Sequence, residues 1–235
     1  MRAYMKSALP CYGIASPLRR SLTAALVREQ PLPDTATLSA TMRALWRGAQ
    51  QREERYAAME LARVGPHRKL LALSMWPLYE EMIADGAWWD YCDDISAGAL
   101  APLLQRHPRE VKPLLRRWAR GNNVWLRRAA FLCQRTLKGD DFDAVLFYDT
   151  ILPSIGTSPF AGEFFIRKGI GWALRSRSYS APDEVRAFIR EYRAQLSPLT
   201  QREAMKVIER RQRATGAAKL TGSGPPIATT VSRIR

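Results

Sequence analysis

The chain has 235 residues, of which 46% are hydrophobic and 25% are charged, as is typical of a folded protein rather than a disordered one. Its formal net charge is +15, and 30 of its 37 basic residues are arginine. Because arginine presents a planar fork that binds phosphate oxygens in pairs, this excess favours a polyanionic partner such as nucleic acid. A general arginine bias of the source would produce the same composition, so composition alone leaves the partner open.

Several other classes of protein are excluded by the sequence. No apolar run approaches the ~18 residues that span a bilayer, and the first twenty residues lack the apolar core of a signal peptide. Three cysteines without C-x-x-C spacing and two isolated histidines argue against a zinc site or a disulfide framework. No glycine-rich phosphate loop is present. We therefore expect a cytoplasmic protein with no metal and no cofactor.

Apolar residues recur with helical spacing along almost the whole chain, and no convincing strand pattern is present. Ser16-Pro17 and Asp34 are typical helix starts, whereas Gly65-Pro66 and Gly121 are typical helix ends. The predicted helices cover residues 18–30, 35–50, 52–64, 69–85 with a break at Pro77, 88–106, 108–120, 123–138, 141–152, 160–178, 182–196 and 200–214. The sequence therefore predicts an all-α protein with one domain at 1–214 and a flexible tail at 215–235.

A repeated pattern connects four of these helices. A charged residue followed by small residues recurs at Arg55, Asp93, Arg128 and Lys168, which are 38, 35 and 40 residues apart. A period near 40 residues built from two helices is typical of HEAT and armadillo repeats. In such an array the second helices line a continuous concave surface. Alanine-rich helices with arginine are common, so chance similarity is the alternative interpretation.

The repeated position is basic in three copies and acidic only at Asp93. A carboxylate in a phosphate-binding groove repels its ligand, so we expect Asp93 there only if it performs a function. Trp89 lies four residues before Asp93, and Trp172 lies four residues after Lys168, so each shares a helix face with the repeated position. The pattern predicts a basic groove with aromatic side chains and one carboxylate. The alternative is that the tryptophans belong to the core and that Asp93 only pairs with an arginine.

The sequence resembles the AlkD-like DNA alkylation repair glycosylases, which are HEAT-like repeat proteins. The resemblance covers nearly the whole chain up to about Arg213, with a looser match at 138–161. The segments that carry it are residues 12–20, 45–61, 88–96, 122–132 and 163–175. The W-D-x-x-D element that begins at Trp89 and the R-K-x-x-G-W-A-L-R element that begins at Arg167 are its most specific motifs. The implied fold is a right-handed α-solenoid of HEAT-like antiparallel helix pairs with a concave basic groove.

The resemblance also implies roles for particular residues. The catalytic aspartate of the family matches Asp93, its groove tryptophans match Trp89 and Trp172, and its DNA-contacting arginine matches Arg128. The expected DNA-binding residues of this chain are Arg55, Arg127, Arg128 and Lys168.

The implied activity is hydrolysis of the N-glycosidic bond of purines alkylated at N3 or N7 in duplex DNA, by a monomer without a cofactor. The alkylated base is cationic and therefore leaves without protonation by a general acid. A carboxylate is needed only to stabilise the positive charge that develops on the sugar and to orient the attacking water. Two alternatives remain: a non-catalytic binder of damaged or branched DNA, and a protein–protein scaffold that binds an acidic partner.

Overall fold

The computed structural model describes residues 8–221, with side chains described through residue 214. Within this range there is no β-strand, and the prediction of an all-α protein is confirmed. The α-helices are α2 (Ser16–Glu29), α3 (Thr35–Gly48), α4 (Arg52–Leu61), α5 (Trp76–Gly86), α6 (Trp89–Ile95), α7 (Ala101–Arg106), α8 (Pro108–Arg120), α9 (Val124–Leu132), α10 (Ala144–Ile151), α11 (Phe164–Arg177), α12 (Pro182–Glu191) and α13 (Pro198–Thr221).

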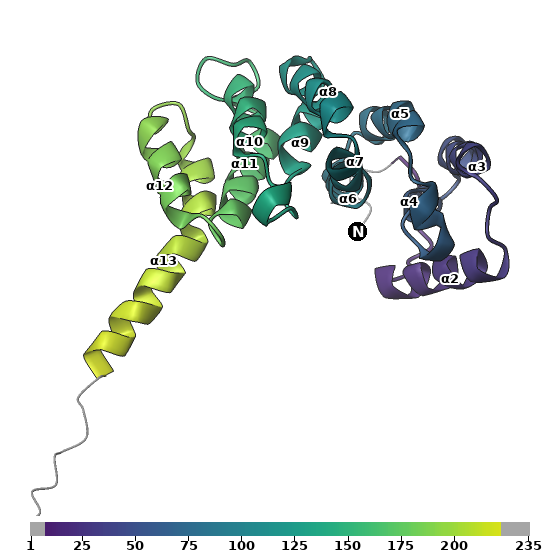
Figure 1. The fold of residues 1–235 in the computed structure, drawn as a ribbon, viewed down its shortest axis with the longest axis horizontal. Coiled ribbons are helices and arrows are strands. Elements are labelled where there is room, and N and C mark those ends of the chain that lie inside the picture. The colour runs from purple at the N-terminus through teal and green to yellow at the C-terminus, as the bar shows by residue number, and fades with distance from the viewer. Residues whose placement is uncertain (1–7, 222–235) are drawn as a thin grey trace, which may run out of the picture.

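The helices follow one another in chain order along a curved row (Figure 1). Helices α3, α5, α8 and α10 lie along the outer edge of the row, and each is followed in the chain by a partner on the inner edge, α4, α6, α9 and α11. Helix α2 lies at one end of the row, and α12 and α13 lie at the other. This arrangement places the second helix of each pair on the concave side, and the right-handed twist of a HEAT-like solenoid stays a prediction.

Local sequence signals explain most helix boundaries. The side chains of Asp34 and Asn123 accept hydrogen bonds from backbone N–H groups in the first turns of α3 and α9, which satisfies donors that have no partner within the helix. Pro77 lies in the first turn of α5, where its missing N–H costs nothing. The break that we expected inside 69–85 is therefore a helix start, and the residues before it form two short 3-10 helices, Gly65–Leu70 and Leu73–Met75.

The predicted helix at 88–106 is also divided. Helix α6 passes through a wider π-helical turn at Ser96–Leu100 into α7. Pro102, in the first turn of α7, has no N–H to donate to a carbonyl of the preceding turn, which explains why regular α-helical bonding is interrupted there. The catalytic candidate Asp93 thus lies on the short helix α6, which ends where the π-helical segment begins.

The hydrophobic core consists of two clusters that meet at α9. The first extends from α2 through α9 to Leu146 of α10 and includes Trp46, and the second extends from α9 to α13 and includes Phe147. Within α9, Ala130 belongs to the first cluster and Phe131 to the second. Helix α9 is therefore packed on two sides, which restricts the movement of any side chain that it holds on the concave surface.

Among the described residues, three ion pairs connect inner helices at a separation close to the repeat period. They are Arg52–Asp90 between α4 and α6, Asp93–Arg128 between α6 and α9, and Lys168–Glu203 between α11 and α13. The two residues of each pair are 38, 35 and 35 positions apart in the chain. The period found in the sequence therefore corresponds to contacts between neighbouring repeats.

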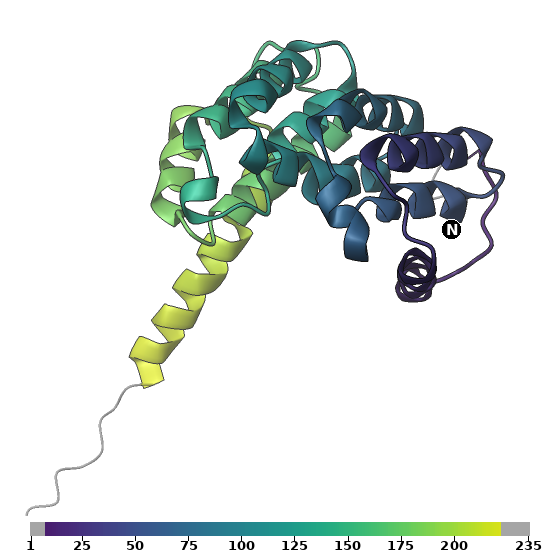
Figure 2. The ribbon, with the colours of Figure 1, turned by 45° about the vertical axis from the view of Figure 1, so that its right-hand side comes forward.

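Helix α13 extends away from the rest of the molecule (Figure 2) and ends at Thr221, seven residues past the predicted domain limit of 214. Residues 217–220 are alanine, lysine and leucine, which favour helix and explain the continuation beyond Gly216. The remainder of the predicted flexible tail, 222–235, lies outside the described residues. Among the described residues, no helix is long and apolar enough to cross a membrane.

Candidate functional site

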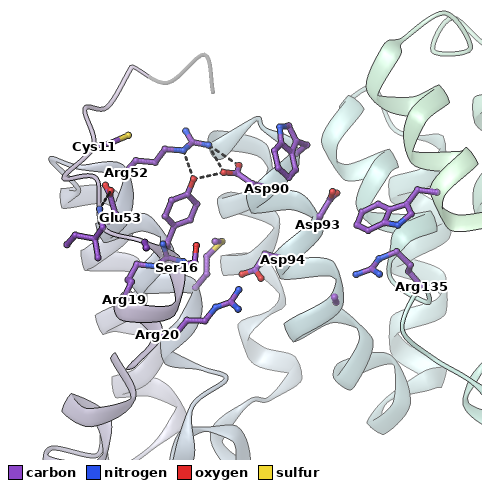
Figure 3. Close-up of a pocket in the computed structure, with 17 residues that line it drawn as sticks. Cys11, Ser16, Arg19, Arg20, Arg52, Glu53, Asp90, Asp93, Asp94 and Arg135 are labelled. Atoms are coloured by element: carbon purple, nitrogen blue, oxygen red, sulfur yellow. Dashed lines mark hydrogen bonds and ion pairs between the residues drawn. The ribbon is translucent and has the colours of Figure 1, made fainter. Parts of the chain in front are cut away.

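Two adjoining cavities, which together we call the cleft, lie on the inner side of the row. The N-terminal cavity has a volume of about 480 Å³ and lies between α2, α4, α6 and α11 (Figure 3). The C-terminal cavity has a volume of about 280 Å³ and lies between α6, α9 and α11. Trp89, Asp93 and Trp172 line both cavities, so Asp93 stands where the two meet.

Asp93 is held by Arg128 through two parallel hydrogen bonds. The guanidinium donates from Nε to Oδ1 over 2.7 Å and from Nη2 to Oδ2 over 2.8 Å, and the two side chains are only 11% and 4% exposed. Burial raises the pKa of the Asp93 carboxyl above its ordinary value, and the hydrogen bonds and charge of Arg128 oppose that rise. The arrangement fixes the direction of a nearly buried carboxylate.

The guanidinium of Arg128 is also held by helix α11, through a nitrogen that does not contact Asp93. Its Nη1 donates to the backbone oxygen of Phe165 on α11, so all three guanidinium nitrogens have protein acceptors. Gly169 makes this possible, because a Cβ at that position would lie 2.5 Å from Arg128 Nη1 and 2.9 Å from the ring of Phe131. The missing side chain lets α11 approach α9 closely enough to complete the site.

Aromatic side chains surround the carboxylate. Trp89 begins α6, and Trp172 on α11 carries the guanidinium of Arg135 over its ring at 4.1 Å from the centroid. Phe164 is 52% exposed on the wall of the C-terminal cavity. Behind it, Phe165 packs against two further tryptophans at ring-centroid distances of 5.1 and 5.0 Å. The cleft thus offers apolar ring surface beside a charged centre.

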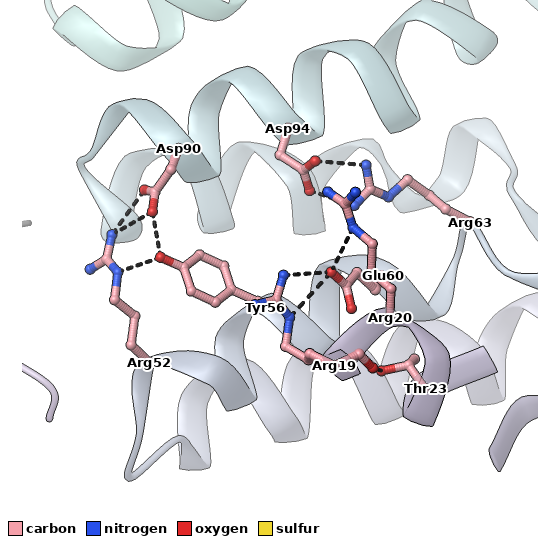
Figure 4. Close-up of polar contacts among 9 residues, drawn as sticks. All are labelled: Arg19, Arg20, Thr23, Arg52, Tyr56, Glu60, Arg63, Asp90 and Asp94. Carbon is pink, nitrogen blue, oxygen red and sulfur yellow. Dashed lines mark hydrogen bonds and ion pairs between the residues drawn. The ribbon is translucent and has the colours of Figure 1, made fainter. Parts of the chain in front are cut away.

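A second group of polar contacts connects α2, α4 and α6 beside the N-terminal cavity (Figure 4). Arg52 on α4 donates to both carboxylate oxygens of Asp90 at 2.8 and 2.9 Å, and the hydroxyl of Tyr56 donates to the same carboxylate. Close by, Arg19 of α2 pairs with Glu60 at 2.7 Å. These contacts join α2, α4 and α6 at the edge of the cavity.

The structure brings five of the predicted site residues together on the walls of the cleft. They are Trp89, Asp93, Arg128, Lys168 and Trp172. Lys168 is 42% exposed and pairs with Glu203. Burial by itself would raise the pKa of Glu203, but hydrogen bonds from Lys168 and Lys206 hold it at about 2. Lys168 therefore reaches the cleft as a cation that already has a partner.

Arg55 and Arg127 do not line the cleft. The guanidinium of Arg55 lies 2.9 Å from Asp85 and over the ring of Trp46, on the side of α4 that packs against α3 and α5. Arg52 and Tyr56 are the α4 residues that face the cavity instead. A difference of one position turns a helical side chain by about 100°, so a repeat alignment that is displaced by one residue selects the wrong face.

Arg127 illustrates the same geometry on α9. Its guanidinium donates to the backbone oxygens of Gly121 and Pro153 and lies 4.0 Å from the ring centroid of Phe160, and the residue is 5% exposed. Adjacent residues of a helix point about 100° apart, so only one of Arg127 and Arg128 can face the cleft. Arg127 thus packs between α9 and the segment that follows α10.

Sequence reasoning missed Arg135. It gave pairing of Asp93 with an arginine only as the alternative interpretation and did not identify Arg128 as the partner. Arg135 is seven residues, or two helical turns, after Arg128, so helical spacing was a usable signal. The two residues of the ion pair are 35 positions apart, which is the repeat spacing found in the sequence, so the period placed them on neighbouring repeats but did not show that their side chains meet. Among residues 8–221, no three histidine, cysteine or acidic side chains are grouped so that they could hold a metal ion.

Comparison with known proteins identifies a family and a similar solved structure. The family model for DNA alkylation repair enzymes matches residues 1–208. A solved structure described as a predicted DNA alkylation repair enzyme from Enterococcus faecalis is 30% identical in sequence, with a TM-score of 0.75. The match covers 88% of this chain and 92% of that one. A search of curated proteins finds no match.

The family match and the all-helical fold together indicate a helical protein of DNA alkylation repair. The chain belongs to the DNA alkylation repair enzyme family, as its resemblance to the AlkD-like proteins led us to expect. Membership gives it a role in alkylation repair and implies that it binds DNA.

Proposed function

We propose that this protein is an alkylpurine DNA N-glycosylase that acts as a monomer on duplex DNA within the cytoplasm, where the nucleoid lies. Its substrates are purines made cationic by alkylation at N3 or N7. The observation that carries this proposal is the Asp93 carboxylate, which two hydrogen bonds from Arg128 hold at the junction of two cavities. Membership in the family supports the wider role in alkylation repair.

The reaction requires little help with the leaving group. When the N-glycosidic bond breaks, its electron pair returns to the alkylated base, whose positive charge is thereby neutralised. The deoxyribose gains oxocarbenium character, and a water molecule then forms the new bond to its C1′. A carboxylate directed at that carbon stabilises the positive charge and accepts a hydrogen bond from the attacking water, whose proton passes to solvent.

Asp93 can stabilise the positive charge on the sugar while it remains paired with Arg128. A carboxylate has about four lone-pair positions, and Arg128 occupies one on each oxygen. The remaining positions are available to a water molecule. We therefore assign Asp93 as the catalytic residue and Arg128 as the residue that positions it. This role replaces the expected contact of Arg128 with DNA, because its side chain is only 4% exposed and all three nitrogens of its guanidinium have protein acceptors.

Trp89 and Trp172 supply the walls against which the sugar and the backbone pack. A tryptophan face attracts a positive charge by up to ~2 kcal/mol when water is excluded. Arg135 already covers one face of Trp172, so the sugar is expected to use the other parts of these two rings. We assign Lys168, which lines the C-terminal cavity, to contact with the backbone.

The deciding experiment replaces the catalytic carboxylate. Asp93→Asn preserves size and removes the charge, so base release from a duplex that contains N7-methylguanine should fall by roughly 100–1,000-fold while duplex binding is kept. Base release is measured under single-turnover conditions, with the rate of spontaneous loss subtracted. The matched control is Asp149→Asn on α10, which removes a carboxylate that pairs with Arg116 outside the cleft.

The outcomes separate the remaining alternatives. Unchanged base release by Asp93→Asn would remove Asp93 from the mechanism. A wild-type protein that binds duplex DNA but releases no base from N3- or N7-alkylated DNA would instead be the non-catalytic binder. Loss of activity in Asp149→Asn as well would show that any lost carboxylate disturbs the fold.

A further inference from the structure

The N-terminal cavity contains one arginine, Arg135, that forms no ion pair with any described residue; the charge of Asp93, which is bound to Arg128, acts on it only from beyond ion-pair distance. Arg135 lines this cavity together with Asp93 and Trp172, and it is half-buried. Among the described residues, no carboxylate lies within ion-pair distance of its guanidinium and no acceptor is hydrogen-bonded to it. Its guanidinium carbon lies over the ring of Trp172, 4.1 Å from the ring centroid.

The carboxylates of the same cavity are all engaged elsewhere. Asp90 binds Arg52, Asp93 binds Arg128, Asp94 binds Arg63, and Glu53 accepts hydrogen bonds from the backbone N–H groups of Tyr12, Gly13 and Ile14. The other two arginines on its walls, Arg19 and Arg20, both lie against Glu60. Arg135 is thus the one arginine on the described walls of this cavity without an acidic partner.

Stacking on Trp172 fixes the orientation of this guanidinium without neutralising it. The ring covers one face of the planar group, and the N–H donors lie in the plane, so they remain directed outward. Burial lowers the pKa of Arg135, which reflects the cost of holding a cation in this place without a hydrogen-bond acceptor. An anion that entered the cavity would offset that cost.

The chemistry of the site selects the kind of anion. A planar fork with donors in one plane suits two oxygens of a phosphate, and it is always charged. The site adjoins Asp93, where the sugar of the damaged nucleotide lies under the proposed function. A phosphodiester joined to that sugar is the anion that necessarily accompanies it into the cleft.

We propose that Arg135, stacked on Trp172, forms a phosphodiester subsite that binds the DNA backbone next to the nucleotide held at Asp93. This inference rests on the proposed function for the position of the nucleotide but not for the chemistry of bond cleavage. In this subsite Trp172 acts as the support of the guanidinium, and Arg135 sets the position of the strand relative to the carboxylate.

The test measures the salt dependence of binding to an undamaged duplex. Each phosphate contact contributes about 0.9 to the slope of log affinity against log salt. We expect Arg135→Ala to lower this slope by about 0.9 and to weaken binding about tenfold at 100 mM salt. The matched control is Arg109→Ala, which removes one exposed positive charge at the start of α8, outside both cavities, and should leave the slope unchanged.

A conservative variant separates charge from geometry. Arg135→Lys keeps the cation and should keep the slope, but it loses the planar group and should bind with an affinity between those of Arg135→Ala and the wild type. Thermal unfolding of each variant checks that the fold is intact. If Arg135→Ala is folded and its slope equals that of the wild type, the subsite does not exist.

The result is independent of catalysis, because undamaged DNA contains no base to release. A reduced slope together with no base release by the wild type would support the subsite and overturn the glycosylase. An unchanged slope together with normal base release would overturn the subsite alone.

Discussion

At the scale of single residues, the site depends on a carboxylate that is both buried and paired. Burial and the guanidinium of Arg128 act on Asp93 in opposite directions, and burial has the larger effect on its pKa. A carboxylate that is partly protonated stabilises a developing cation poorly. The proton affinity of Asp93 therefore links the geometry of the site directly to the pH at which the protein works.

This link predicts the pH profile. Because the pKa of Asp93 is raised, base release should fall with decreasing pH at a midpoint above the ordinary value of 3.8. Arg128→Gln removes the charge that opposes the rise and should move the midpoint upward by about 1–3 pH units. The profile is measured by single-turnover base release at pH values from about 4 to 8, across the ordinary range of carboxyl pKa values.

Arg128→Lys is the control for this experiment, because it keeps the charge and loses the paired hydrogen bonds. Its midpoint should lie between those of the wild type and Arg128→Gln. A midpoint that is identical in all three proteins would mean that a group other than Asp93 controls the profile.

At the scale of helices, the site depends on how closely α9 and α11 approach each other. Arg128 reaches Asp93 on one side and the backbone of α11 on the other, so it links three inner helices. The approach requires a residue without a side chain at position 169. Under the proposed function, the packing of these helices is thus part of the catalytic geometry as well as its support.

Gly169→Ala tests this dependence. Alanine favours helix by up to ~1 kcal/mol over glycine, but its Cβ would lie 2.5 Å from Arg128 Nη1, so the guanidinium must move. We expect the protein to lose about 1–3 kcal/mol of stability and base release to fall at least about tenfold. Denaturant unfolding and single-turnover kinetics measure the two effects.

The comparison for this variant is Gly48→Ala at the end of α3, where an added Cβ would meet nothing within 4 Å. It should leave both stability and base release close to those of the wild type. Wild-type activity in Gly169→Ala would show that Arg128 tolerates displacement and that the close approach of the two helices serves packing alone.

At the scale of the whole molecule, charge and curvature act together. The chain carries a net charge of +15, and its inner helices form a curved row with a cleft on the concave side. Many arginines of this surface are already paired with acidic residues, so the net charge overstates the number of cations that can meet phosphate. We propose that residues 1–214 form one domain, since the two core clusters meet at α9.

The whole-molecule prediction concerns binding to undamaged duplex DNA by the wild type. If about four or more phosphates are neutralised, affinity should fall at least about 100-fold between 50 and 200 mM salt. Fluorescence anisotropy with a labelled duplex measures this. Absence of binding at about 50 mM salt would contradict a DNA-binding groove and favour the protein–protein scaffold.

Local physical chemistry explains why so much of the fold could be predicted. Helical periodicity, caps such as Asp34 and breaks such as Gly121 act over a few residues, and they indicated the all-α class and most helix boundaries. The repeat period predicted that Asp93, Arg128 and Lys168 lie on successive inner helices. The same short-range reasoning placed Arg55 on the wrong side of α4, because an alignment error of one residue turns a helix face by about 100°.

The sequence by itself therefore determined the class of fold, the period of its repeats and the presence of one carboxylate among basic and aromatic residues. Only the tertiary structure decided which cations are neutralised. Arg128 is paired with Asp93 and Lys168 with Glu203, whereas Arg135 rests on a tryptophan without an acidic partner among the described residues. The physical reason is that pairing depends on distances between helices 35 residues apart, which no local pattern specifies.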